Sequence, residues 1–233
     1  MNFSTKIIHW YNQNYRDLPW RNTTDAYKIW LSEIILQQTR VSQGLPYYNN
    51  FIRAFPTVKD LANADEQQIL KLWQGLGYYS RARNLHFTAK FVLENYNGVF
   101  PNSYEELLKL KGIGTYTAAA IASFSSNEAV AVVDGNVFRV LSRVFNVDYD
   151  ISQNTSKKYF IELATKVLSK KQPNIHNQAI MEFGALQCVP KSPNCEVCIF
   201  NDSCEAYKLK IVSELPVKSK KVIDTKRCLN YKL

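Results

Sequence analysis

Two carboxyl side chains stand where the sequence can give them different chemical tasks. Glu33 lies within the apolar segment 29–38, where burial would raise its pKa and suit it to act as a general acid near neutral pH. Asp134 follows a short apolar run and precedes a helical pattern. Cleavage of a glycosidic bond needs an acid for the departing group and an anion for the oxocarbenium-like sugar. The alternatives are a surface position for Glu33, on the polar side of its helix, and a plain helix N-cap for Asp134.

Four cysteines, Cys188, Cys195, Cys198 and Cys204, follow the pattern C-x6-C-x2-C-x5-C. Such a short segment brings four thiolates to one metal centre if it folds round that centre. Structural zinc sites usually combine two close pairs, whereas this pattern has one close pair and two outlying cysteines. The spacing favours an iron–sulfur cubane, with zinc as the alternative. Cys228 lies outside the pattern and is expected to be a free thiol.

A glycine-containing turn lies between two helical patterns, in the sequence LKGIGTYT at residues 110–117. Gly112 and Gly114 permit positive φ angles in a tight turn. We expect the backbone amides of Ile113 and Gly114 to be left bare at the start of the second helix, where they would bind an anion such as a DNA phosphate. Ordinary turns between helices also use Gly-x-Gly, so the motif is weak by itself.

The elements that must position these groups are mostly helical. Apolar residues recur at helical spacing around residues 30–41 and 137–145, and no Gly or Pro interrupts residues 28–40, which allows a continuous helix there. Ser103 and Glu106 fit a capping box, so a helix should begin after Ser103. The apolar run 129–133 is too short to be a strong strand signal. We therefore predict an all-α protein.

Composition and charge limit the class of protein. The 233 residues carry a net charge of +9, of which +5 falls after Cys204, so a polyanionic partner and a solubilising tail are both compatible with the charge. No apolar run is long enough to cross a bilayer. The first residues lack the apolar core of a signal peptide, which favours a cytoplasmic location and a reducing compartment, where cysteines bind metal rather than form disulfides.

Six motifs in one order resemble the MutY family of adenine DNA glycosylases, within the endonuclease III superfamily. They are LPWR at 18–21, WLSEIILQQT at 30–39, GLGYYSRARN at 75–84, the glycine turn at 110–117, VDGNVFRVL at 133–141 and the cysteine loop at 188–204. The resemblance runs from about Trp10 to Cys204, which is nearly the whole chain.

The resemblance implies two helical lobes with a helix-hairpin-helix motif. Residues 1–204 would form the catalytic region, with a six-helix barrel lobe at about 25–134. The other lobe would join the N- and C-terminal helices to a loop, residues 188–204, that holds a [4Fe–4S] cluster. Residues 205–233 would be a basic tail or a linker toward a C-terminal domain that is absent here. The expected partner is double-stranded DNA with a mispaired adenine. The protein is expected to be a monomer and not to associate with a membrane.

Motif position also implies catalytic roles. Glu33 would protonate adenine at N7, and Asp134 would stabilise the sugar cation. Asn136 would help to hold the water and Asp134. Tyr116 stands where bifunctional relatives carry a Schiff-base lysine, and a phenol cannot form an imine. The resemblance therefore implies a monofunctional enzyme that removes adenine opposite guanine or 8-oxoguanine and leaves the DNA backbone intact.

Further positions match residues that contact the substrate. Gln38 and Tyr78 match residues that wedge into the duplex beside the extruded nucleotide, and Gln37 belongs to the same motif as Gln38. Positions that match the lining of the adenine pocket are Leu18, Trp20, Arg21, Leu36, Gln178 and Met181. For Trp20 and Leu36, simple core packing is the alternative.

The sequence departs from the family pattern in two places, and it leaves two other functions as alternatives. The family continues into a Nudix-like domain that recognises 8-oxoguanine, whereas this chain stops where residues 227–233 resemble the first strand of that domain. Lys191 is the only basic residue between Cys188 and Cys195, so phosphate contacts look sparse there. The alternatives are a thymine glycosylase for T·G mispairs, in the same superfamily, and a non-catalytic DNA-binding module.

Overall fold

The computed structural model describes residues 2–219, so Cys228 and the strand expected at 227–233 lie outside the described residues. Over this range the chain is all-helical and has no β-strand, which confirms the predicted fold class. The elements are α1 (Phe3–Asn14), the 3-10 turn η1 (Pro19–Arg21), α2 (Ala26–Leu36), α3 (Val41–Ala54), α4 (Val58–Asn63), α5 (Glu66–Trp73), α6 (Ser80–Asn95), α7 (Tyr104–Leu107), α8 (Thr115–Ser126), α9 (Gly135–Phe145), α10 (Asn154–Val167), α11 (Pro173–Leu186) and α12 (Glu205–Lys208). Among them, none is long and apolar enough to cross a membrane.

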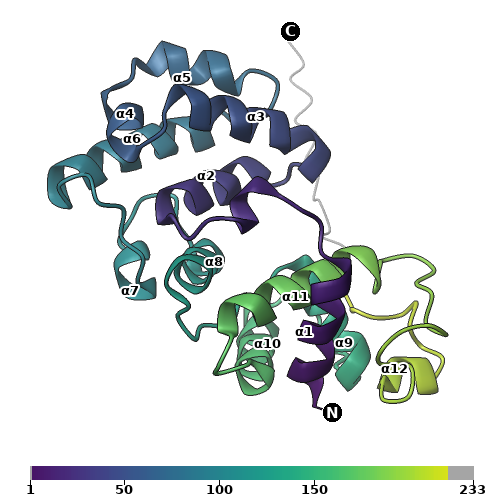
Figure 1. Ribbon diagram of the computed structural model, residues 1–233. Helices are drawn as coiled ribbons and strands as arrows, with labels where there is room; N and C mark the ends of the chain where they lie inside the picture. The colour runs from purple at the N-terminus through teal and green to yellow at the C-terminus, as the bar shows by residue number, and fades with distance from the viewer. Residues whose placement is uncertain (1, 220–233) are drawn as a thin grey trace, which may run out of the picture.

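Helices α2–α8 form one lobe, called here the hairpin lobe (Figure 1). Its core is contributed by α2, which is buried on almost every side, and by the apolar faces of the helices around it. Trp30, Phe51 and Trp73 fill the centre with large, fully buried side chains. Most residues of α2 are apolar because neighbouring helices cover most of its surface.

Helices α1 and α9–α12, with the loop 188–204, form the second lobe, called here the cysteine lobe (Figure 1). The first helix of the chain packs along α11, which is one of the last, and α9 packs against both α11 and α12. Phe183 and Phe200 meet edge to face in its core, with their ring centroids 5.4 Å apart. The lobes meet where α8 contacts α11.

Three local expectations differ from the structure in detail. The helix allowed over residues 28–40 ends at Leu36, and a turn at 37–40 precedes α3. Ser103 accepts a hydrogen bond from the Glu106 amide, but the Glu106 carboxylate binds Tyr96 and Lys109 instead of completing the capping box. Residues 205–219 include the short helix α12, and Leu215 is buried in the core of the cysteine lobe.

Candidate active site

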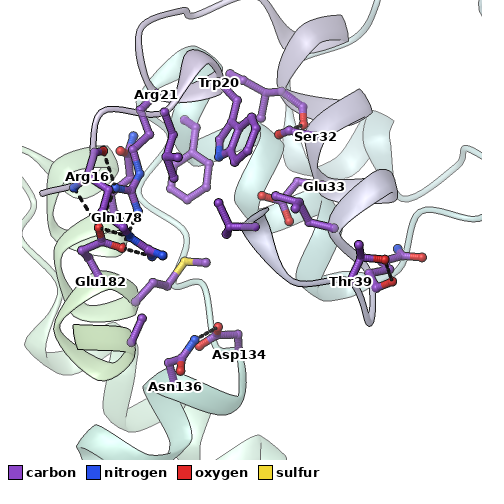
Figure 2. Close-up of a pocket in the computed structure, with 18 of the residues that line it drawn as sticks. Arg16, Trp20, Arg21, Ser32, Glu33, Thr39, Asp134, Asn136, Gln178 and Glu182 are labelled. Atoms are coloured by element: carbon purple, nitrogen blue, oxygen red, sulfur yellow. Dashed lines mark hydrogen bonds and ion pairs between the residues drawn. The ribbon is translucent and has the colours of Figure 1, made fainter. Parts of the chain in front are cut away.

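A pocket of about 260 Å³ opens between the two lobes. The predicted site residues that line it are Leu18, Trp20, Arg21, Glu33, Leu36, Gln37, Tyr116, Asp134, Asn136, Gln178 and Met181. Figure 2 shows Glu33 entering from α2, Asp134 and Asn136 from the start of α9, and Gln178 from α11. The pocket thus gathers residues from four of the six sequence motifs, and from α11.

Glu33 lies on α2 with Trp30 and Ile34 on the same helix, and its half-buried side chain lines the pocket. Burial raises its pKa to about 7, although a hydrogen bond with Tyr116 lowers it, and the nearby Asp134 charge raises it further. Burial and the two carboxylates also raise the pKa of Tyr116 well above its ordinary value. A carboxyl with a pKa near 7 carries a proton for a large part of the time at neutral pH.

Asp134 is the N-cap of α9, so the alternative drawn from the sequence describes its local structure correctly. Its Oδ1 accepts a hydrogen bond from the Val137 amide at 2.8 Å, and its Oδ2 accepts one from Asn136 Nδ2, also at 2.8 Å. Burial raises the pKa of Asp134 above its ordinary value, and these donors, together with the Arg139 charge, offset only part of that rise. Because Asp134 both caps α9 and lines the pocket, its position is compatible with the role of a helix N-cap and with that of a catalytic carboxylate.

Arg139 connects this carboxylate to the cysteine loop. Its Nη2 donates to Asn136 Oδ1 at 2.8 Å and to the Gly184 carbonyl, while its Nε donates to the Cys188 carbonyl at 2.8 Å. Asn136 in turn donates to Asp134. One buried guanidinium therefore fixes both the amide that holds Asp134 and the first residue of the cysteine loop.

Glu182 is a pocket residue that sequence reasoning missed. It is 1% exposed and accepts hydrogen bonds from Arg16, including its backbone amide, and from Arg21. Burial alone would raise the pKa of Glu182, but the hydrogen bonds from the two arginines outweigh it and lower the pKa to about 2. A glutamate within the apolar sequence AIMEFGAL was the signal that could have identified it. Other lining residues that were missed are Arg16, Ile29, Ser32, Thr39, Val41, Phe124 and Ala185.

Gln178 on α11 and Trp20 in η1 both line the pocket (Figure 2). Tyr11 donates its hydroxyl hydrogen to Gln178 Oε1 at 2.8 Å, which turns the amide nitrogen away from Tyr11. The ring of Trp20 meets that of Tyr48 at 75°, with centroids 5.2 Å apart, so Trp20 both packs on the hairpin lobe and lines the pocket.

Four predicted DNA-contacting residues lie outside the pocket. Gln38 and Tyr78 are exposed, each in a turn of the hairpin lobe. Gly112 has φ +78°, whereas Gly114 has an ordinary φ of −91° and is the N-cap of α8. The expectation that both amides are bare was wrong for Ile113, because its amide donates to the Leu110 carbonyl.

The four loop cysteines line one cavity with Arg143, Phe183 and Phe200. Arg143 is 2% exposed, and its Nη1 lies 3.5 Å from Cys188 Sγ. Its other hydrogen-bond acceptors are carbonyl groups, and no carboxylate pairs with it within residues 2–219. A buried cation beside the Cys188 thiol, in a cavity that all four loop cysteines line, fits an anionic metal–thiolate cluster.

Comparison with known proteins identifies both parts of the chain. Residues 31–170 match the HhH-GPD superfamily of base excision DNA repair proteins, and residues 188–204 match the iron–sulfur binding domain of endonuclease III. The second match decides between zinc and an iron–sulfur cluster in favour of the cluster.

Relatives and solved structures agree with these matches. An adenine DNA glycosylase of Buchnera aphidicola subsp. Baizongia pistaciae (strain Bp) is 42% identical over 88% of this chain and 58% of its own length. The Homo sapiens adenine DNA glycosylase is 41% identical over 88% of this chain and 39% of its own length. The chain thus spans less than two thirds of these relatives.

Among solved structures, a thermostable thymine-DNA glycosylase superposes with a TM-score of 0.82 and 31% identity, over 89% of this chain and 95% of that chain. A non-covalent endonuclease III–DNA complex has a TM-score of 0.75 at 19% identity, over 89% and 94%, and so shares the fold. With a family match that covers more than half of its length, this chain belongs to the HhH-GPD superfamily of base excision DNA repair proteins.

Proposed function

We propose that this chain hydrolyses the N-glycosidic bond of adenine mispaired with guanine or 8-oxoguanine in duplex DNA. The observation that carries the proposal is the pairing of Glu33 and Asp134 across one pocket, with the pKa of Glu33 raised to about 7. The choice of adenine as the excised base comes from the relatives, which are adenine DNA glycosylases at about 40% identity.

The two carboxyl groups divide the reaction between them. Protonated Glu33 donates its proton to a ring nitrogen of adenine as the bond from the base to C1′ breaks, and the electron pair of that bond leaves with the base. Ionised Asp134, with both oxygens held by N–H donors, stabilises the positive charge that develops on the sugar. Water then adds to C1′, a carboxylate accepts its proton, and an abasic sugar remains.

The remaining pocket residues recognise and hold the base. Gln178, oriented by Tyr11, presents its amide N–H groups to acceptor atoms of the base. Tyr116 stands beside Glu33 and has no amine with which to form an imine, so the strand stays uncut. On the protein surface, Gln38 and Tyr78 enter the duplex, while the turn at Gly112 and Gly114 follows the DNA backbone.

In this proposal Cys188, Cys195, Cys198 and Cys204 would hold a [4Fe–4S] cluster. Cys188 and Cys198 already accept N–H hydrogen bonds, from Arg143 and from the Phe200 amide. Such bonds and the buried Arg143 charge suit the negative charge of a cluster with four thiolate ligands. The purified protein should be yellow-brown and contain about four irons per chain.

The test measures which free base is released. Duplexes containing A·G, A·8-oxoguanine or T·G are incubated with excess protein, and released bases are separated by chromatography. Adenine release from the first two, with strand breaks only after alkali, supports the proposal. Thymine release from T·G alone supports the second candidate, which the 31% identical thymine-DNA glycosylase structure favours. DNA binding without any base release would make the chain a binding module.

A further inference from the structure

Two turns of the hairpin lobe contain non-glycine residues with left-handed backbone conformations. Gln38 has φ +56° and Tyr78 has φ +46°. Three of the other non-glycine residues with positive φ are asparagines, which adopt this conformation readily, whereas Gln and Tyr do not. Tyr78 is also 67% exposed, so burial of its ring does not compensate for the strain. Something else in the structure must hold both turns.

Arg81, in the first turn of α6, contacts both turns at once. Its Nη1 donates to the Gln37 carbonyl at 2.6 Å and also lies 3.0 Å from the Ile34 carbonyl at the end of α2. Its Nη2 donates to the Leu76 and Gly77 carbonyls at 3.2 and 3.4 Å. Gln37 and Gly77 immediately precede the two left-handed residues. One guanidinium therefore fixes the peptide group that enters each strained residue.

The same helix also supports the glycine turn. Thr88 donates its hydroxyl hydrogen to the Lys111 carbonyl at 2.7 Å. Asn84 faces Gly112 so closely that a Cβ at that glycine would lie 3.3 Å from Cβ of Asn84. Arg81, Asn84, Gln37 and Gly112 line one small pocket. Helix α6 thus supports all three turns that the proposed function assigns to DNA, and Arg81 supports two of them.

We propose that Arg81 is a positioning residue for base extrusion: it holds Gln38 and Tyr78 in the conformations that enter the duplex, without touching the DNA. This inference rests on the proposed function, because excision of adenine from a duplex requires that the nucleotide be extruded from the stack. The planar fork of arginine donates in two directions at fixed angles, whereas a lysine has one nitrogen and cannot span both turns. Arg81→Lys therefore keeps the charge and removes the connection.

The test compares Arg81→Lys with a matched control, Arg83→Lys. Arg83 lies on the same helix and makes an exposed ion pair with Glu66 at 3.4 Å. Single-turnover adenine release is measured from an A·G duplex and from a duplex in which adenine faces an abasic-site analogue and is already poorly stacked. Fluorescence of 2-aminopurine beside the mispair reports opening of the stack independently of catalysis. Melting temperatures establish that each variant is folded, and Arg81→Gln replaces Arg81→Lys if the latter is not.

Arg81→Lys should slow release from A·G about 10–100-fold and suppress the 2-aminopurine signal, with most of the rate recovered on the abasic-analogue duplex. Arg83→Lys should match the wild type. In a Gln38→Ala, Tyr78→Ala background, Arg81→Lys should add no more than about a twofold effect. The inference is overturned if Arg81→Lys changes neither adenine release from A·G nor the 2-aminopurine signal. It is also overturned if Arg81→Lys slows release equally on both duplexes and equally in the Gln38→Ala, Tyr78→Ala background. If the wild type releases no adenine, the proposed function fails, and the 2-aminopurine signal alone decides the role of Arg81.

Discussion

Replacing Glu33 with Gln should have two opposite effects, on catalysis and on stability. The pKa of Glu33 is about 7 in the folded protein against an ordinary value of 4.5. The unfolded chain therefore releases this proton first as the pH rises, so the folded state loses stability between pH 4.5 and 7 and stays penalised above pH 7. The difference between the two values, at about 1.4 kcal/mol per pH unit, gives an upper value of about 3.5 kcal/mol. Gln has no charge and escapes this penalty.

Urea denaturation at pH 5 and pH 8.5 measures the stability effect. Glu33→Gln should be more stable than the wild type by up to about 3.5 kcal/mol at pH 8.5, with a much smaller gap at pH 5. The control is Glu94→Gln, an exposed glutamate on α6, which should show no such difference. Equal stabilities of Glu33→Gln and the wild type at pH 8.5 would show that Glu33 is not held protonated by burial.

The same variant tests the general acid. Adenine release should fall by a factor of about 10²–10⁴ in Glu33→Gln at pH 7, because no proton is delivered to the base. In the wild type the protonated fraction of Glu33 drops from about 90% at pH 6 to about 10% at pH 8, and the rate should drop with it about tenfold. A near-normal single-turnover rate for Glu33→Gln would assign the acid to another residue.

Four further outcomes follow from the site. Asp134→Asn keeps an N-cap side chain, so we expect a folded protein that binds mispaired DNA within an order of magnitude but releases almost no adenine; parallel loss of binding in a titration would make the residue structural. Tyr116→Phe removes a hydrogen bond that lowers the pKa of Glu33, so the alkaline limb of the pH–rate profile should move to higher pH; a shift to lower pH contradicts this. Borohydride should trap no covalent DNA adduct of the wild type, and a substantial yield would refute the role of Tyr116. Cys188→Ser should lose iron and visible absorption, whereas zinc without iron in the wild type would refute the cluster.

The sequence predicts what is encoded locally. Glu33 and Trp30 lie on one helix, and Asp134 directly precedes the pattern of α9, so their neighbours along the chain already indicate an apolar carboxyl and an N-cap. The helix class was also predictable, because apolar spacing repeats with the helical period. The end of α2 at Leu36 was not, because Gln38 takes a left-handed conformation that no local breaker announces.

Contacts between distant segments explain the remaining misses. Glu182 binds Arg16, and Gln178 binds Tyr11, across more than 160 residues in each case. No spacing pattern links such pairs, and their partners emerge only when α1 packs on α11. The Ser103–Glu106 box fails for a similar reason: Tyr96, ten residues away, competes for the Glu106 carboxylate.

The packing of α1 on α11 also sets an order of events during synthesis. Ile7, Trp10 and Tyr11 bury their side chains in the cysteine lobe, whose other helices begin only at Gly135. At about 5–20 residues per second, the ribosome needs roughly 10–30 s to proceed from α1 to the end of α11. The hairpin lobe, contiguous from α2 to α8, can fold during that interval. The first helix made therefore waits as an unpartnered apolar segment beside a finished lobe, and is exposed to chaperones and proteases until α11 leaves the ribosome.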